Sequence, residues 1–182
     1  MPRIAYQPLD LAEPRALVDA IRTRRGGTLL NLDRILLYSP PLAEGWNSFL
    51  GNVRTRLALP ARLRELAICV VARLNGADYE FHHHAPLFLQ AGGTQAQLDA
   101  IDGLAEGLRP DAFDAADAAD AADAAVAQFT FESTRLVKVA DATFASTRTA
   151  LGEDRLLVEL VGVIASYNMV SRVLVAFDVQ PE

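Results

Sequence analysis

The sequence predicts an all-α protein, on the basis of three observations. Residues that begin and end helices recur along the chain, apolar residues in its middle follow the helical period, and strand signals are scarce. Of the 182 residues, 51% are apolar and 22% are charged, which is an ordinary balance for a soluble globular protein. The length is typical of one domain, and we expect residues 1–182 to form it.

The first half of the chain contains well-marked helix boundaries. Gly26 and Gly27 end the first predicted helix, and Ser39, as an N-cap before two prolines, begins the second. Pro60 begins the third. The predicted helices cover residues 11–25, 39–56, 60–74, 78–91, 94–104, 111–137, 141–151 and 153–177.

The helix over residues 60–74 has the strongest pattern. From Leu63 to Leu74 its apolar residues recur at i, i+3, i+4 and i+7, as one face of a helix requires. From Leu66 to Ala72 every residue is apolar. A helix that is apolar all round is usually buried, so we expect this one to lie in the core.

Two further helices follow from their start and stop signals. Asn75-Gly76 ends the apolar helix, and Asp78 can cap the next, which continues to the glycine pair at residues 92–93. Thr94 then caps a short helix that continues to Leu104.

Residues 111–125 are a low-complexity segment of alanine and aspartate, including the repeat DAADAADAADAA at 114–125. A three-residue step spirals around a helix, so these aspartates mark no single face. We interpret the segment as the solvated start of a long helix that continues to about Val137; an acidic docking surface is the alternative.

The last helix, opened by the acidic pair Glu153-Asp154, is apolar enough to raise the question of a membrane. Residues 156–177 are about long enough to span a bilayer. Glu159, Asn168 and Arg172 interrupt this stretch, and charges at such depth are costly. We therefore expect a helix buried in protein or in a subunit contact, and no membrane partner.

Charge and cysteine content restrict the classes of partner and compartment. The net charge of −6 argues against nucleic-acid and anionic-membrane partners. The single cysteine, Cys69, cannot form an internal disulfide, which favours a reducing compartment. The N-terminal residues lack an apolar signal region, so we expect a cytoplasmic protein.

A bend at Asn75-Gly76 predicts a candidate site. If the helices on either side form an antiparallel hairpin, Glu65, ten residues before Asn75, lies level with His84, nine residues after it. Glu80 and His84 are i,i+4 neighbours on one helix face. A carboxylate can fix the tautomer of an imidazole and raise its basicity, as acid–base chemistry requires. Alternatively, the pair simply satisfies two buried polar groups.

The three consecutive histidines do not predict a metal cluster. Successive helical side chains point about 100° apart, so His82 and His83 do not share the direction of His84. Glu65, Glu80 and His84 remain a possible set of metal ligands, but we expect neither a metal nor a cofactor. His83 lies one turn beyond Tyr79 and is a second candidate for the site, whereas we expect His82 at the surface.

The motif RELAICVVARLNGADYEFHHHAPLFLQAG resembles the carboxymuconolactone decarboxylase/AhpD-like superfamily. The segments LYSPPLAEGWNSFLGNVRTRLALPARLREL and ELVGVIASYNMVSRVL extend the resemblance to about residues 30–177. It implies an AhpD-like helical bundle with a central antiparallel hairpin, which assembles into trimers or hexamers. The alkylhydroperoxidase branch has a cysteine pair, NGCxYCxxxH, at whose positions this chain has Ala77 and Glu80. The remaining YExxxH pattern is similar to the decarboxylase branch.

The resemblance implies an acid–base enzyme that decarboxylates or isomerises a small unsaturated acid or lactone. In this hypothesis His84 transfers the proton, Glu65 orients the His84 imidazole, and Glu80 is a second acid–base group. His83 or Tyr79 hydrogen-bonds the developing oxyanion. The alternatives are a peroxiredoxin relative that has lost its redox cysteines, or a non-catalytic helical oligomer that binds a ligand. A buried Cys69 would be unreactive in either case.

Three further residues are candidates for the walls of a substrate pocket. Trp46 is one, with simple core packing as the alternative. Tyr167 and Asn168 are polar groups in the apolar last helix, and they reach either the same cavity or a subunit interface. We interpret Arg64 and Arg73 as solvated helix residues.

Overall fold

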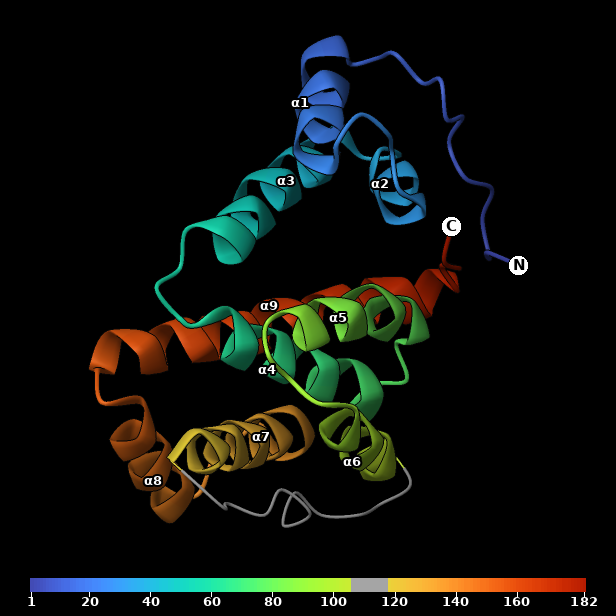
Figure 1. Ribbon diagram of the computed structural model, residues 1–182. Helices are drawn as coiled ribbons and strands as arrows, with labels where there is room; N and C mark the ends of the chain where they lie inside the picture. The colour runs from blue at the N-terminus through green and yellow to red at the C-terminus, as the bar shows by residue number, and fades with distance from the viewer. Residues whose placement is uncertain (106–117) are drawn as a thin grey trace. The chain divides into compact units, whose positions relative to one another are not determined.

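The computed structural model describes residues 1–105 and 118–182, and within these residues the regular elements are all helices (Figure 1). The prediction of an all-α fold is confirmed. The helices are α1 (Arg15–Arg25), α2 (Asn31–Leu36), α3 (Pro40–Thr55), α4 (Ala61–Leu74), α5 (Asp78–Gln90), α6 (Gln95–Ala105), α7 (Ala118–Leu136), α8 (Asp141–Leu151) and α9 (Asp154–Phe177).

Most of these boundaries lie within a few residues of the predicted ones, and α2 is the element that sequence reasoning missed. The interpretation of residues 111–117 as a helix start lies outside the described residues. Two predicted caps differ in detail. Ser39 precedes α3 without a side-chain cap bond, and Ala77 rather than Asp78 is the N-cap of α5. Thr94 does cap α6, because its Oγ1 accepts a hydrogen bond from the backbone N–H of Gln97 at 3.2 Å.

The chain folds into two compact units, one of residues 1–57 with 174–182 and one of residues 58–173. The single domain over residues 1–182 therefore stays a prediction. The first unit contains α1, α2, α3 and the end of the chain. Its interior includes Trp46, which is 5% exposed.

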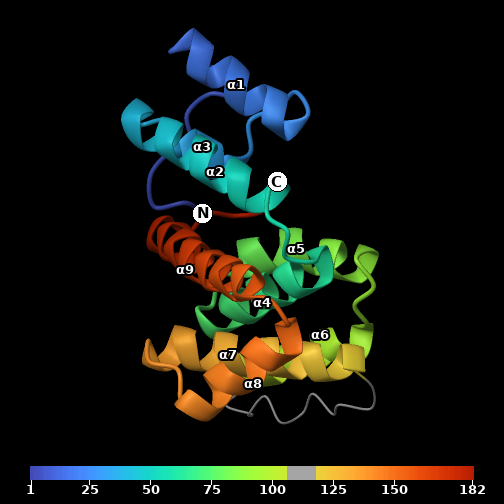
Figure 2. The same ribbon diagram turned by 90° about the vertical axis from the view of Figure 1, so that its left-hand side faces the viewer.

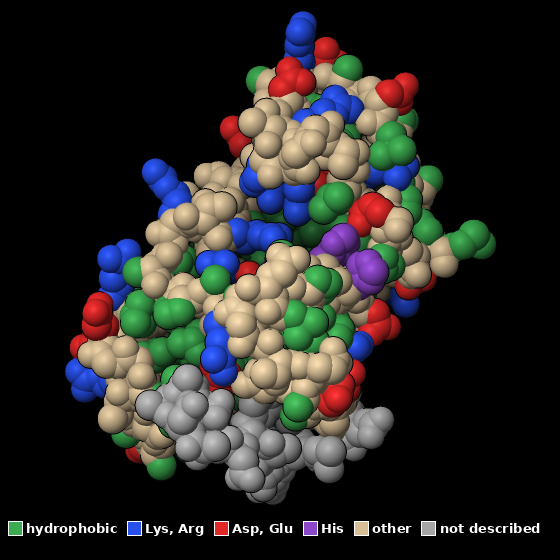
Figure 3. All heavy atoms as spheres, in the orientation of Figure 1, with side chains coloured by type: hydrophobic (Ala, Val, Ile, Leu, Met, Phe, Trp, Pro, Cys, Tyr) green, Lys and Arg blue, Asp and Glu red, His purple; other side chains and the backbone are tan. Residues whose placement is uncertain are grey.

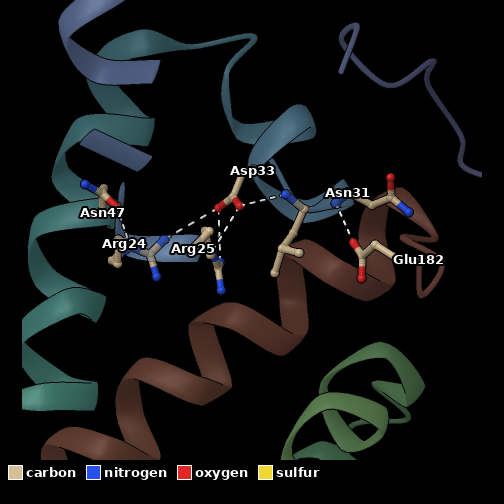
Figure 4. A network of polar contacts seen from close by, with 7 residues as sticks. Arg24, Arg25, Asn31, Asp33, Asn47 and Glu182 are labelled. Atoms are coloured by element: carbon tan, nitrogen blue, oxygen red, sulfur yellow. Dashed lines mark hydrogen bonds and ion pairs between the residues drawn. The ribbon is translucent and has the colours of Figure 1, made fainter. Parts of the chain in front are cut away.

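A buried carboxylate organises the first unit (Figure 4). Asp33 is 2% exposed and accepts two hydrogen bonds from Arg25, at 3.0 and 3.1 Å. Arg24 lies 3.6 Å from the same carboxylate and also donates to Asn47. Asp33 further accepts the backbone N–H of Leu30 at 3.1 Å, which stabilises the first turn of α2. This short helix thus depends on an ion pair with α1 that no sequence period reveals.

In the second unit α4 is the central helix. It contacts α5, α6 and α7, and Figures 1 and 2 both show it between α5 and α7. Each residue from Leu66 to Ala72 has 0% of its surface exposed, so the prediction of a helix buried on every side is confirmed. Burial of this kind is the main contribution to the stability of a helical core.

The turn between α4 and α5 closes through backbone hydrogen bonds. The N–H of Ala77 donates to the carbonyl of Ala72 at 2.8 Å, and the N–H of Gly76 donates to that of Arg73 at 3.2 Å. This is a Schellman motif, which needs a left-handed residue after the helix. Gly76, with φ of +65°, supplies it. The turn needs only three residues and brings α5 back along α4.

Helix α9 adds buried side chains to the same unit, among them Leu160, Ile164, Tyr167 and Ser171. Within the described residues, it is the one helix long and apolar enough to cross a membrane by length and composition. These properties do not by themselves indicate a membrane span, because a core helix of a soluble protein has them too.

Candidate acid–base site

Helices α4 and α5 bring a carboxylate and an imidazole together in the core. The Nδ1 atom of His84 lies 2.6 Å from Oε2 of Glu65. Glu65 is 3% exposed and His84 is 4% exposed. The sequence predicts this proximity, because Glu65 and His84 lie at nearly equal distances from Asn75 along the two helices. A hydrogen bond of this length between buried groups fixes the imidazole in one orientation.

The other carboxylate oxygen of Glu65 contacts a cation. The Nε atom of Arg64 donates to Oε1 of Glu65 at 3.2 Å, and the Arg64 side chain is 16% exposed. The interpretation of Arg64 as a solvated residue is therefore wrong. Its positive charge favours the ionised form of Glu65, and an ionised Glu65 accepts the Nδ1–H of His84.

Tyr167 covers the imidazole from α9. The rings of His84 and Tyr167 lie 5.0 Å apart, centroid to centroid, and are nearly perpendicular at 85°. Tyr167 is 2% exposed. An edge-to-face contact of this kind is favourable and restricts the rotation of both rings. Tyr167, predicted as a possible pocket residue, is thus in direct contact with the proposed proton carrier.

Glu80 lies in the same core but has a different partner. Its two carboxyl oxygens lie 3.1 and 3.2 Å from the hydroxyl oxygen of Ser171 on α9. Glu80 is 2% exposed. Burial raises its pKa well above the ordinary value, and the hydrogen bond from Ser171 opposes this only in part. The neutral carboxylic acid is therefore favoured, which makes Glu80 a potential proton donor.

Cys69 lies within electrostatic range of both acidic groups. It is completely buried, and burial raises the pKa of its thiol, as does the negative charge of Glu65. The thiolate is the reactive form of cysteine. This environment therefore suppresses thiol chemistry at the one cysteine of the chain.

Tyr79 and His83 form a second pair on α5. Their ring centroids lie 4.4 Å apart. Tyr79 is 6% exposed and His83 is half-buried. Because residues 79 and 83 lie one position before 80 and 84, they occupy a helix face about 100° away from Glu80 and His84. His82 is exposed, as predicted, and Figure 3 shows histidine side chains (purple) at the surface.

Asn168 has a role that the sequence did not suggest. Its side chain accepts a hydrogen bond from Asn75 at 3.0 Å and donates one to Thr134 at 3.1 Å. It therefore joins α9 to the α4–α5 turn and to α7, and fixes the rotation of α9 beside the site. Trp46, the third predicted pocket residue, belongs to the other unit.

Arg73 is also held by specific contacts rather than solvated. It lies 3.1 Å from Asp78 and 2.5 Å from Asp102, and its guanidinium lies 3.5 Å from the centre of the Phe81 ring. The interpretation of Arg73 as a solvated residue is wrong. These contacts join α4, α5 and α6 at one end of the hairpin.

The described residues do not assemble a metal site. In residues 1–105 and 118–182, no three His, Cys, Asp or Glu side chains form a group that could hold a metal ion. Glu65, Glu80 and His84 do not form such a group. What the arrangement can do chemically is exchange protons, through His84 and through the neutral acid of Glu80.

Comparison with known families identifies the family of this chain. The pattern of the carboxymuconolactone decarboxylase family matches residues 40–130, which is half of the chain. The chain belongs to the carboxymuconolactone decarboxylase family. No functionally curated protein is similar enough in sequence to match it.

Three solved structures, of two proteins, share the fold of this family member. An uncharacterized peroxidase-related protein from Silicibacter sp. TM1040 is 17% identical, with a TM-score of 0.73, over 97% of this chain and 87% of that one. The debrominase Bmp8 is 17% identical, with a TM-score of 0.74, over 99% and 93% of the two chains. A Bmp8 variant has also been solved in complex with 2,3,4-tribromopyrrole, at 16% identity and a TM-score of 0.73 over 99% and 92% of the two chains. These likenesses establish the AhpD-like fold.

Proposed function

We propose that this family member is an acid–base enzyme that decarboxylates or isomerises a small unsaturated acid or lactone. The observation that carries the proposal is the buried hydrogen bond between Glu65 and His84. Because Nδ1 is bonded to Glu65, a proton exchanged with a substrate has to pass through Nε2. Glu65 stabilises the imidazolium that forms when His84 takes up a proton.

In the decarboxylation, the carbon–carbon bond to the carboxylate breaks and carbon dioxide leaves. The electron pair of that bond moves into the conjugated carbonyl system, which becomes an enolate. The His84 imidazolium then transfers its Nε2 proton to a carbon of the enolate, and a proton from water restores the imidazolium. In the isomerisation, neutral His84 removes a proton from one carbon and returns it to another.

The enolate-like intermediate carries negative charge that needs a nearby donor. Glu80 supports this role because burial favours its neutral, proton-bearing form. Tyr79 and His83 remain candidates for the oxyanion contact, and Tyr167 limits the motion of His84.

Thiol peroxidase chemistry is disfavoured. Such chemistry needs a reactive thiolate and, in the cysteine-pair branch, a second thiol. The sequence has one cysteine, and Cys69 is buried with its pKa raised. A relative that has lost its redox cysteines, or a ligand-binding oligomer without catalysis, is the alternative if no turnover is found.

The proposal includes a small-molecule substrate, a homo-oligomer of three or six chains and a cytoplasmic location, without nucleic-acid or membrane partners. Exposed apolar side chains along α9, among them Val158, Val161 and Met169, support an assembly through this helix. The net charge of −6 supports the absence of nucleic acid.

The test is a turnover assay with a defined set of probes. Carboxymuconolactone, β,γ-unsaturated acids and enol lactones are incubated in D₂O with the wild-type protein and with His84→Gln. Because Bmp8 has been solved with a tribromopyrrole, that compound is added to the set. Release of carbon dioxide, or deuterium in the product, that depends on His84 supports the proposal. Turnover that is equal in both proteins contradicts it.

A further inference from the structure

Ser171 is a polar residue that no sequence pattern indicates and that the structure buries completely, with 0% of its surface exposed. It lies on α9, most of whose buried positions are apolar. Buried hydroxyls need a partner. The partner of this one is the Glu80 carboxyl group on α5, with both oxygens within 3.2 Å of the hydroxyl oxygen.

A comparison with Ser166 shows that this contact is specific. Ser166 lies on the same helix and is also buried, at 3% exposed. Its hydroxyl donates to the carbonyl of Val163 in its own helix at 2.9 Å, which is the usual choice of a helical serine. Ser171 instead reaches across to another helix. The two residues share burial, residue type and helix, and differ in whether they contact Glu80.

The surroundings of Glu80 oppose its ionisation. On α4, the thiol of Cys69 lies within electrostatic range of Glu80 and of the carboxylate of Glu65. On its own helix His84 lies one turn away and is bonded to Glu65. On α9 the facing polar group is Ser171. The hydroxyl is therefore the group that stabilises charge on Glu80, because it donates to the carboxylate that remains when the proton leaves.

We propose that Ser171 is a positioning residue of the acid–base site: its hydroxyl orients the Glu80 carboxyl group and allows it to release its proton during the reaction. This inference rests on the proposed function for its catalytic consequence, but the effect of Ser171 on Glu80 is independent of any substrate. When Glu80 donates, its O–H bond breaks and the proton passes to the enolate oxygen, which gives an enol. Ser171 then donates to the Glu80 carboxylate, which takes the same proton back from the enol oxygen when His84 protonates the carbon and the carbonyl re-forms.

The experiment measures the titration of Glu80 directly. The protein is labelled with ¹³C at the glutamate carboxyl carbons, and the Glu80 signal is assigned by its absence in Glu80→Gln. The titration is compared in wild type, Ser171→Ala, Ser171→Thr and Ser166→Ala. We expect Ser171→Ala to raise the Glu80 pKa by about one pH unit or more, since a hydrogen bond to a charged acceptor is lost. Ser171→Thr retains a hydroxyl and restores the wild-type value, and Ser166→Ala leaves it unchanged.

Where turnover is found, the limb of the pH–rate profile that belongs to Glu80 moves to higher pH in Ser171→Ala and returns in Ser171→Thr. An unchanged Glu80 titration in Ser171→Ala, or an equal change in Ser166→Ala, overturns the role of Ser171. If Ser171→Ala does not fold, Ser171→Cys replaces it, with a weaker donor of similar shape and the same direction of change expected. Absence of turnover in every protein counts against the proposed function, while the titration still decides the role of Ser171.

Discussion

The Nδ1 atom of His84 and the Oε2 atom of Glu65 lie 2.6 Å apart in a part of the core where both residues are at least 96% buried. The two residues belong to adjacent helices joined by a three-residue turn. Arg64 contacts the opposite oxygen of the same carboxylate. The carboxylate is therefore held from two sides, and the orientation of the imidazole follows from it.

The charge of Glu65 is tested by Glu65→Gln. The amide oxygen can still accept the Nδ1–H of His84, but it no longer stabilises an imidazolium. We expect kcat/KM to fall by about 100-fold, within the range of acid–base contributions. The same substitution at the exposed Glu44 is the control. A Glu65→Gln protein with the activity of the control would show that the pair is structural.

Glu80 makes stability depend on pH in a defined direction. Its pKa is 4.5 in an unperturbed chain and is raised in the folded protein, so the folded state retains the proton longer than the unfolded one. Its contribution to stability is complete below pH 4.5 and is lost as pH rises through the folded pKa. Relative to Glu80→Gln, the wild type should lose up to about 1.4 kcal/mol of unfolding free energy per pH unit in this window.

The measurement is urea unfolding of both proteins at a series of pH values. If the difference in unfolding free energy between wild type and Glu80→Gln is constant from pH 4.5 upward, Glu80 is ionised in the folded state and its pKa is not raised. If the wild type instead loses stability relative to Glu80→Gln as the pH falls, the pKa of Glu80 is lowered, which contradicts the prediction.

Cys69 is expected to be dispensable for chemistry. Because its thiol is buried and its pKa is raised, Cys69→Ala should retain turnover within about threefold, with a loss of about 1 kcal/mol in stability from the smaller side chain. Alkylating reagents should not modify the folded wild type. Thiol-dependent peroxide reduction that disappears in Cys69→Ser would restore the peroxidase interpretation.

Gly93 tests the packing at the end of α5. A Cβ atom at this position would lie 2.4 Å from the ring of Phe88, which is completely buried. We expect Gly93→Ala to lower the unfolding free energy by about 1–3 kcal/mol through overpacking. Gly162, in α9, has no neighbour within 4 Å of an added Cβ, so Gly162→Ala should stabilise by about 0.5–1 kcal/mol. Equal effects of the two substitutions in thermal unfolding would contradict this packing.

Several features were predictable because they depend on local spacing. The apolar run from Leu66 to Ala72 predicts a helix buried on every side, and the Asn75-Gly76 step predicts its end. The distance of Glu65 and His84 from that step predicts their encounter, because rise per residue is constant in a helix.

Other features depend on contacts between distant segments, which spacing does not encode. Ser171 reaches Glu80 from 91 positions away, and Asn168 is bonded to Asn75 rather than exposed to a cavity. Arg64 and Arg73 are at helix positions that suggest solvation, yet carboxylates of neighbouring residues and helices hold them. Helix α2 was missed because its stabilising partner, Arg25, lies in another helix.

The most direct test of the central claim compares wild type and His84→Gln on carboxymuconolactone and the related unsaturated acids, in D₂O, with both proteins shown to be folded. The account predicts that the wild type releases carbon dioxide or incorporates deuterium, and that His84→Gln is slower by at least about 100-fold. Equal rates in the two proteins, or no conversion of any probe by the wild type, would contradict it.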